Sequence, residues 1–422
     1  MAGYYYNRAA AGVHDPLQAK AIVIEKDGVT AAIVACDLSS LPRPIAEAAR
    51  RRITELVKIP PTHVMISATH THTGPVLLSG PTRYNLEGEM KRIGLEYTNS
   101  LGDRIAEAVR LAHASLRPAR VMAGEGREDS LTFNRRFHMK DGTVAWNPRK
   151  LDPNIDRPAG PIDGSLPTVY FEGADGKPIA IYVNYALHLD TVGGQEYSAD
   201  YPYMLSQILS AARGKDLVTV FTIGCAGNLN HRDVSSDDPQ KGHGEAARIG
   251  AVLAGEVLKT LKRMTPSEVP SIRATSELLQ LPLPPVQPNE VDWARTTAAT
   301  FGNSKPAPFM DLVQAFKIID VVERKGKPFE AEVQVITLGR SIGFVALPGE
   351  IFVEHGLAIK RASPFPQTVV AELANGSVGY VPDRKAFPQG AYEVVSSRTA
   401  AGSGEMMVES AAKQLIKLYH QQ

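Results

Sequence analysis

The chain has 422 residues and is almost neutral, with 46 lysine and arginine residues against 45 aspartate and glutamate residues. Its longest basic block is the triplet Arg50-Arg51-Arg52, which argues against nucleic acid or an anionic membrane surface as a partner. No apolar run reaches the roughly 18 residues that a membrane-spanning helix needs, so no integral membrane segment is expected.

The cysteines and the N-terminus bear on the compartment. Cys36 and Cys225 are the only cysteines, both lie in apolar runs, and neither belongs to a CxxC pair. A disulfide framework and a zinc ribbon are therefore excluded, and both thiols are expected in the core. The first residues, MAGYYYNRAAAG, lack the apolar core of a signal peptide. We expect a cytoplasmic protein, or an exported one whose signal peptide is not part of this sequence.

Strand-like and helix-like segments alternate along the chain. The predicted strands are residues 19–28, 29–38, 63–70, 168–173, 179–188, 217–225, 332–339, 341–349 and 368–374. The predicted helices are residues 44–57, 97–116, 201–214, 244–264 and 404–421. Several strands are apolar throughout, which is typical of sheets covered on both faces. The pattern predicts an α/β fold in which mixed β-sheets are flanked by helices.

The most proline-rich stretch, at about residues 265–290, resembles an interdomain linker in composition. However, strand-like alternation continues through ATSELLQLPL, and the helical segment that follows soon returns to strand. An edge strand with a surface excursion explains this stretch better than a linker does. We therefore expect residues 1–422 to form one domain.

Polar side chains follow four of the predicted strands, where each strand ends in a turn with glycine or proline. They are His70 and His72 in ISATHTHTGP, His188 and Asp190 in IYVNYALHLDTVGG, Asn228 and Asn230 in FTIGCAGNLNHRD, and Glu350 in FVALPGE. A rigid sheet fixes such groups while the loop exposes them. Two histidines one residue apart suggest a metal, a proton shuttle or chance. Histidines from two strand ends and a carboxylate suit catalytic zinc, although each residue alone also fits core packing or a helix cap.

Signatures of several competing chemistries are absent. The chain has no G-x-S-x-G elbow of a serine hydrolase and no phosphate-binding glycine loop. The HxH motif continues as Thr73-Gly74-Pro75, which differs from the HxHxDH of metallo-β-lactamase-like enzymes. At least two strands precede it and the later pattern is not eightfold, so an amidohydrolase barrel does not fit either.

Taken together, these segments resemble the catalytic domain of the neutral/alkaline (non-lysosomal) ceramidases and their shorter relatives. ISATHTHTGP is close to the family's ATHTHSGP signature and is the most specific match. The other matching segments, in the family's order, are GVHDPLQAKAIVI before it and FNRR, NYALH with YSADYP, LPGE and GYVPDRKAFPQGAYE after it. The resemblance spans almost the whole chain and implies a layered αββα arrangement of helices and sheets.

The resemblance implies roles for seven residues. One zinc ion would be bound by His70, His188, Glu350 and Tyr380. The pocket around the scissile group would be lined by His72, Arg135 and Tyr392. Tyr380 as a ligand is implied by the family alone, whereas the histidines and Glu350 also follow from the chemistry of the strand ends. Asp190 and Asp200 are further candidates, for orienting a ligand histidine.

Two departures from the family pattern shape the expected function. Within Gly227-Asn228-Leu229-Asn230-His231, an asparagine stands where the family carries a serine, so we expect attack by metal-activated water. The chain also ends where ceramidases continue into an immunoglobulin-like domain, and it has no apolar membrane-docking helix. We therefore expect a small or medium-sized polar amide, ester or lactone as substrate.

Two alternatives remain open. The first is a metal-binding or ligand-binding relative that has lost turnover, which the two asparagines of that segment motivate. Histidine and carboxylate ligands also suit iron or manganese. The sequence does not define the oligomeric state.

Overall fold

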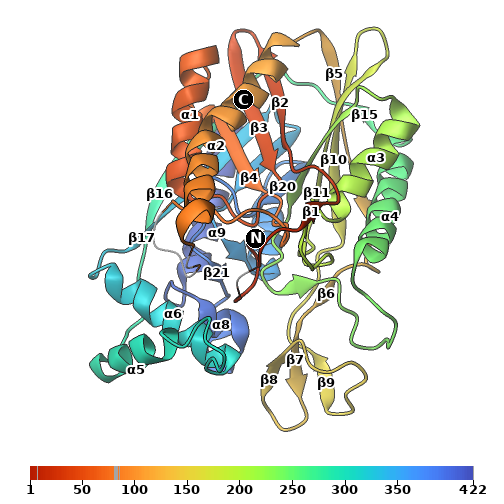
Figure 1. Ribbon diagram of the computed structural model, residues 1–422. Helices are drawn as coiled ribbons and strands as arrows, with labels where there is room; N and C mark the ends of the chain where they lie inside the picture. Colours follow the sequence, from red (N-terminus) through yellow and green to blue (C-terminus); the bar gives the residue numbers. More distant parts are fainter. Residues whose placement is uncertain (7, 80–83, 85, 422) are drawn as a thin grey trace.

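The computed structural model describes residues 1–6, 8–79, 84 and 86–421, with two stacked layers of β-sheet between two layers of helices (Figure 1). The first layer holds a three-stranded sheet, β2-β3-β4, formed by Ala19–Lys26, Val29–Cys36 and Val64–Ala68. Beside it lies a five-stranded sheet in the order β13-β11-β10-β5-β15. Its strands, in that order, are Val218–Ile223, Pro178–Tyr185, Ser165–Gly173, Ala119–Arg127 and Thr265–Pro266.

The second layer is a four-stranded sheet in the order β16-β17-β18-β20. Its strands are Ile272–Leu281, Phe329–Leu338, Ile342–Ala346 and Gln367–Ala371. Parallel and antiparallel pairs occur in all three sheets, so the prediction of mixed sheets is confirmed. The proline-rich stretch contains β16, which is an edge strand as predicted.

Helices cover the outer face of each layer (Figure 1). The first layer packs against α1 (Arg43–Val57), α2 (Gly88–Ala114), α3 (Tyr201–Arg213) and α4 (His243–Leu261). The second packs against α7 (Val353–Ala362) and α9 (Ser403–His420). Below them lie α5 (Pro288–Ala298), α6 (Phe309–Glu323), α8 (Tyr392–Ser396) and a small sheet of β7 (Arg136–Met139), β8 (Val144–Trp146) and β9 (Ile155–Pro158).

The alternation of side chains along β3 shows why two sheet layers form. Ala32 and Val34 point to the helix side, whereas Ala31 and Ile33 point to the four-stranded sheet, and all four are buried. A strand that is apolar at every position can be satisfied only when both of its faces are covered. The predicted αββα arrangement is confirmed.

Two further predictions concern the two cysteines and the absence of a membrane-spanning helix. Cys36 and Cys225 are both free and buried, as predicted. Among the described helices, none is both long enough and apolar enough to cross a membrane.

Asn375, which follows β20, links the two sheet layers. Its side-chain oxygen accepts a hydrogen bond from the Ile66 amide of β4 at 3.0 Å, and its own amide donates to the Ile66 carbonyl at 2.8 Å. Its side-chain nitrogen donates to the Gln334 side chain of β17 at 2.8 Å. The residue is buried and has a φ of 60°, a conformation that asparagine tolerates better than most residues. The link lies a few residues before the histidine turn and so helps to fix it.

We predict that Asn375→Ala lowers the free energy of unfolding by about 2–4 kcal/mol, because it leaves a buried amide and a buried side-chain oxygen unpaired. Urea-induced unfolding followed by circular dichroism measures the loss. Asn303→Ala is the matched control, since the Asn303 side chain bonds only weakly at an exposed site, at 3.4 Å from the Ala299 carbonyl. Equal stabilities of the two variants would contradict a structural role for Asn375.

Candidate active site and metal centre

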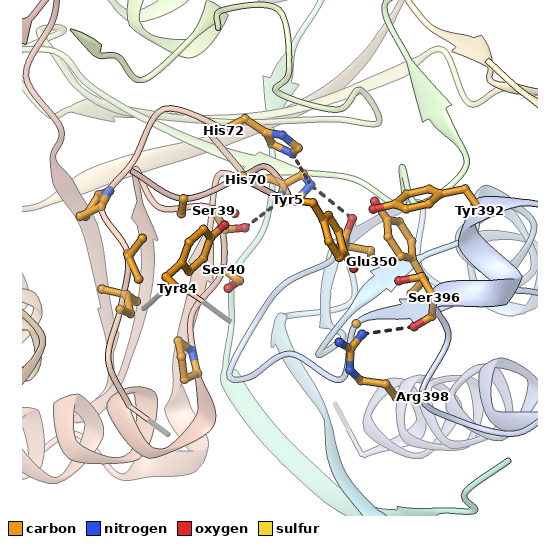
Figure 2. Close-up of a pocket in the computed structure, with 18 residues that line it drawn as sticks. Tyr5, Ser39, Ser40, His70, His72, Tyr84, Glu350, Tyr392, Ser396 and Arg398 are labelled. Atoms are coloured by element: carbon orange, nitrogen blue, oxygen red, sulfur yellow. Dashed lines mark hydrogen bonds and ion pairs between the residues drawn. The ribbon is translucent and has the colours of Figure 1, made fainter. Parts of the chain in front are cut away.

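A cavity of about 210 Å³ opens where β4 and several loops meet, and five of the predicted site residues line it (Figure 2). They are His70, His72, Glu350, Tyr380 and Tyr392. His188 and Arg135 lie directly behind this lining and are almost fully buried. The structure therefore brings together all seven residues for which the resemblance implies metal-binding or catalytic roles.

The turn after β4 places the first two histidines. The strand ends at Ala68, and His70 adopts a φ of 81°, so the HxH motif lies in the turn and not in the strand. The His70 amide donates to the Leu38 carbonyl at 2.9 Å, and the His72 amide donates to the Leu189 carbonyl at 3.1 Å. These backbone bonds hold both imidazoles over the end of the sheet, with their Nε2 atoms 3.3 Å apart.

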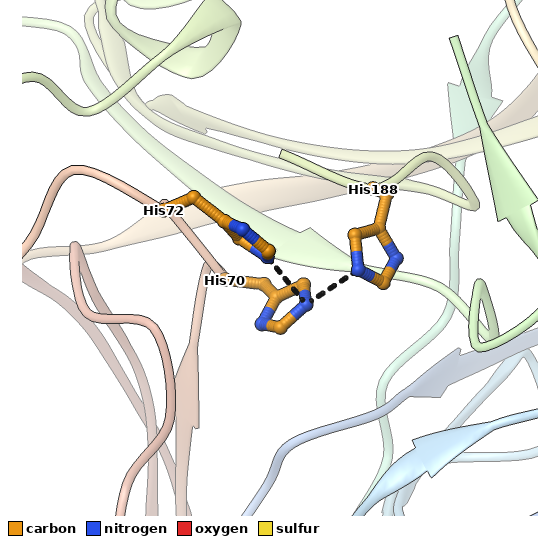
Figure 3. Close-up of side chains that lie close together, drawn as sticks. All are labelled: His70, His72 and His188. Carbon is orange, nitrogen blue, oxygen red and sulfur yellow. Dashed lines mark hydrogen bonds between the residues drawn. The ribbon is translucent and has the colours of Figure 1, made fainter. Parts of the chain in front are cut away.

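The third histidine comes from the end of β11. The Nε2 atoms of His188 and His70 are 2.8 Å apart (Figure 3). His188 Nδ1 faces the Ala226 carbonyl at 3.2 Å, and His70 Nδ1 faces the Ser39 carbonyl at 2.6 Å. Burial lowers the pKa of His188 well below its ordinary value and that of His72 to about 4, so both rings are neutral near pH 7.

The tautomers of His70 and His188 follow from these contacts. A carbonyl oxygen can only accept, so each ring must carry its proton on Nδ1 and a lone pair on Nε2. Two lone pairs that face each other at 2.8 Å repel unless a cation lies between them. Tetrahedral metal–imidazole bonds of about 2.05 Å place two nitrogens about 3.3 Å apart, which is the spacing of the His70 and His72 Nε2 atoms and is wider than that of the His70 and His188 pair. His70, His72 and His188 can thus hold a metal ion, and their ligand atoms all lie within 4.8 Å of one another.

Glu350 and Tyr380 complete the same centre from the other side. Two short strands, β19 (Glu350–Ile351) and β21 (Tyr380–Val381), pair in parallel with Glu350 opposite Tyr380. Glu350 Oε2 lies 3.4 Å from His70 Nε2 and 3.7 Å from His188 Nε2, and no described residue gives it a hydrogen bond. Burial raises the pKa of Glu350, whereas a hydrogen bond from Tyr380 and the charge of Arg135 lower it. An ionised, unpaired carboxylate oxygen aimed at two imidazole lone pairs also fits a cation.

Arg135 is held beside this centre by a residue that the sequence analysis missed. Its Nε donates to Glu393 Oε1 at 2.7 Å and its Nη2 to the Gly227 carbonyl at 2.7 Å. The other oxygen of Glu393 accepts from Arg136 at 3.1 Å, and Glu393 is fully buried. The guanidinium of Arg135 lies 5.4 Å from the Tyr380 ring and 5.9 Å from the Tyr392 ring. No sequence signal identified Glu393, because a single carboxylate beside Tyr392 has no characteristic spacing.

The remaining candidates divide into one residue near the histidines and three with other partners. Asp190 Oδ1 lies 3.8 Å from His72 Nδ1. Asp200 caps α3 and accepts from the amides of Thr191, Val192 and Tyr201. Asn228 bonds the Val353 amide and Glu354, and Asn230 bonds Asn147 and the Arg232 amide. Neither asparagine nor Asp200 lines the cavity.

The comparisons with known proteins agree with this architecture. No family model matches the chain. Neutral ceramidase A of Dictyostelium discoideum is 25% identical over 206 residues, which is 47% of this chain and 27% of that protein. A neutral ceramidase of Mycobacterium tuberculosis is 29% identical over 229 residues, which is 48% of this chain and 35% of that protein. The aligned segment thus spans about a third or less of the curated relatives' length.

Solved structures extend the likeness to the whole fold. The crystal structure of a neutral ceramidase from Pseudomonas aeruginosa matches with a TM-score of 0.74 and 19% identity, covering 99% of this chain and 73% of that one. A ceramidase complexed with C2 matches with a TM-score of 0.75 and 18% identity, covering 100% and 73%. The layered fold is that of the solved neutral ceramidases. In sequence, the chain is similar to neutral ceramidases over about half of its own length.

We predict that Glu393→Gln lowers the free energy of unfolding by about 3–5 kcal/mol, because it leaves Arg135 and Arg136 buried without their shared counter-charge. Thermal and urea-induced unfolding measure the effect. Glu409→Gln serves as control, since its ion pair with Lys413 is exposed on α9 and should be dispensable. An unchanged unfolding midpoint in Glu393→Gln would contradict the assignment.

Asp200 should affect stability in a pH-dependent way. Burial raises the pKa of Asp200 to about 6, against an ordinary value of 3.8, so the folded chain binds more protons than the unfolded chain between about pH 4 and 6. The stability from this group is therefore fully present below pH 4 and is lost as the pH rises through 6. In Asp200→Asn, the free energy of unfolding should fall by about 2–3 kcal/mol less than in the wild type as the pH rises from 4 to 7. Urea unfolding at pH 4, 5, 6 and 7 gives the slope, and parallel slopes for both proteins would refute the prediction.

Proposed function

We propose that this chain is a zinc-dependent hydrolase that cleaves an amide bond of a small or medium-sized polar substrate. The observation that carries the proposal is the 2.8 Å approach of two imidazole Nε2 atoms whose Nδ1 atoms both face carbonyl oxygens, beside an unpaired carboxylate. This donor set of nitrogen and oxygen, with one side open to a cavity, is the kind that catalytic zinc takes.

Four residues would hold the metal, namely His70, His188, Glu350 and Tyr380. When bound there, a zinc ion would make a water molecule acidic enough to supply hydroxide near pH 7. Tyr380 is suited to the fourth position because its hydroxyl already lies against Glu350, its partner across β19 and β21. Tyr380 would lose its proton on binding the metal, as a coordinating thiol does.

His72 is suited to be the general base. It lines the cavity, and its Nδ1 faces a carboxylate where the other two histidines face carbonyls. With a proton on Nδ1, its Nε2 can take the proton of the attacking water and hand it to the leaving nitrogen as the C–N bond breaks. Asp190 would stabilise the imidazolium that forms in between.

Arg135 and Tyr392 are suited to stabilise the oxygen of the tetrahedral intermediate. Both lie beside Tyr380, and Glu393 already fixes the Arg135 side chain before any substrate binds. A donor that is oriented in advance and shielded from water typically contributes about 3 kcal/mol to such a step.

The substrate class rests on the relatives' names and on the cavity. Ceramidases cleave an amide, and an ester or lactone would use the same groups. The cavity of about 210 Å³ is lined by serine, tyrosine and arginine side chains as well as by the centre itself, among them Ser39, Ser396 and Arg398. Such a lining suits a polar molecule better than the chains of a membrane lipid.

We predict about one zinc per chain by elemental analysis, which also detects iron or manganese. His188→Ala should lose most of the metal, because a buried ligand is removed. His72→Ala should keep the metal and lose at least about 100-fold in turnover on an amide library with ester and lactone members. His113→Ala, on the surface of α2, is the control for loss of a histidine.

Three results would overturn parts of the proposal. Absence of metal from the wild-type protein would contradict the proposed zinc-dependent mechanism. Unchanged turnover in His72→Ala would remove the assigned base. A protein that binds metal but cleaves no amide, ester or lactone would favour the ligand-binding alternative.

A further inference from the structure

The N-terminal segment lies across the active-site cavity. We call residues 1–6 together with Arg8 the N-terminal strap. Ala2, Gly3 and Tyr5 of the strap line the same cavity as His70 and His72, and the Tyr5 ring lies over its centre (Figure 2). The Ala2 amide donates to the Gly74 carbonyl at 2.9 Å, which joins the strap to the histidine turn. The strap is thus a wall of the candidate active site.

The strap packs directly on the backbone of His72. Gly3 has a φ of 102°, and a Cβ atom at this position would lie 2.7 Å from both Cα and the carbonyl oxygen of His72. Arg8 Nη2 donates to that carbonyl at 2.5 Å and also to the Ala2 carbonyl. The Arg8 guanidinium lies 4.3 Å from the centre of the Tyr4 ring. Gly3, which precedes Tyr4, is packed on the His72 backbone, and Arg8 lies against the Tyr4 ring. These contacts fix the direction of the Tyr4 side chain.

Tyr4 reaches the carboxylate that faces His72. Its hydroxyl donates to Asp190 Oδ1, the oxygen that lies 3.8 Å from His72 Nδ1. The Tyr4 ring also meets the His72 ring edge-on, with centroids 5.4 Å apart. His72 Nδ1 is buried and has no hydrogen-bond partner among the described residues, so Asp190 is the acceptor placed nearest to its proton.

Asp190 has a competing partner on its other side. Lys241 Nζ lies 3.9 Å from Asp190 Oδ2, and this lysine is mostly exposed. Without the Tyr4 hydroxyl, the carboxylate could turn toward the ammonium and away from the imidazole. A hydrogen bond from a neutral donor keeps Oδ1 in place and does not neutralise its charge.

We propose that Tyr4 is a positioning residue for His72 and acts through Asp190. This inference rests on the proposed function, in which His72 is the general base. Tyr4 holds Asp190 so that the proton of His72 stays on Nδ1 and the Nε2 lone pair points into the cavity. The same carboxylate then faces the imidazolium after Nε2 has taken a proton.

The test compares Tyr4→Phe with Tyr6→Phe in the zinc-loaded full chain. Both changes remove one hydroxyl from the strap, and Tyr6 is a matched control because its ring stacks on Tyr4 and is 55% exposed. Asp190→Asn and the double variant Tyr4→Phe/Asp190→Asn complete the set. Metal content and unfolding midpoint are measured for each, so that loss of the fold or of zinc is recognised.

The first readout does not depend on turnover. Long-range proton–nitrogen NMR spectra report the ring nitrogens of each histidine, and the His72 signals are assigned as those missing in His72→Ala. We expect the Nδ1–H tautomer in the wild type and in Tyr6→Phe, and a shift toward mixed tautomers in Tyr4→Phe and in Asp190→Asn. His72 signals that are identical in Tyr4→Phe and the wild type would overturn the proposal, whether or not any substrate is cleaved.

The second readout is kinetic. Tyr4→Phe should lower kcat about tenfold and leave KM within about twofold, as loss of an orienting partner does. The double variant should be no slower than Asp190→Asn, because Tyr4 acts only through that carboxylate. Additive losses would overturn the proposed route. If no protein of the set cleaves an amide but the His72 signals shift as expected, the proposed function fails while the link from Tyr4 to His72 stands.

Discussion

The close approach of His70 Nε2 and His188 Nε2 is the constraint on which the candidate site depends. Two neutral imidazoles at 2.8 Å, both with their lone pairs inward, are unfavourable without a cation. The fold nevertheless imposes this geometry, because the rings come from the ends of β4 and β11 and each Nδ1 is bonded to a rigid backbone carbonyl. An arrangement that is unfavourable without a cation fits a metal-binding role.

Three carboxyl groups lie near His70 and His188, and they differ in their partners. Glu350 faces the imidazoles, and behind it the Glu372 carboxyl accepts from the Ile351 amide at 2.6 Å. Burial raises the pKa of Glu372 well above its ordinary value, and the charge of Glu350 adds to this effect. A protonated Glu372 can therefore fix the backbone next to Glu350 without adding a second negative charge. Glu393 balances Arg135 and Arg136, whereas Glu350 keeps one oxygen without a hydrogen-bond partner among the described residues.

The sequence predicted those features of the fold and site that local pattern controls. The strands β3, β4 and β11 are mostly apolar and were recognised, and with them the histidines that follow β4 and β11. Helix α2 begins at Gly88, although the sequence predicted it only from residue 97. Its first turns are exposed and mix charged residues with glycine and exposed apolar residues such as Met90 and Ile93, so they lack an amphipathic pattern. The strand β5 was missed, since glycine and charged residues at Gly124–Arg127 hide its pattern.

The site residues that could not be predicted from local sequence are those whose partners lie far away in the chain. Glu393 acquires its role only when α8 packs beside Arg135, and the two-residue strands β19 and β21 are too short to give a periodic signal. Tyr4 lies 186 residues from Asp190 in the chain, in a segment with no regular secondary structure. Asp200 had a plausible spacing from His188, but the helix that starts at Tyr201 uses its carboxylate as a cap. Composition and periodicity contain no information on such partners, and Tyr380 and Arg135 were named as candidates only through the family resemblance.

The position of the asparagines bears on the choice between a covalent route and a water route. Asn230, in the segment where the family carries a serine, is tied to Asn147 and to the Arg232 amide, away from the cavity. The serines that do line the cavity are Ser39, Ser40 and Ser396, and His70 bonds the backbone carbonyl of Ser39 and not its hydroxyl. A serine nucleophile needs a base in hydrogen-bond contact, and in the described part of the chain no histidine bonds any of these three hydroxyls. These contacts support the proposed water route over a covalent one.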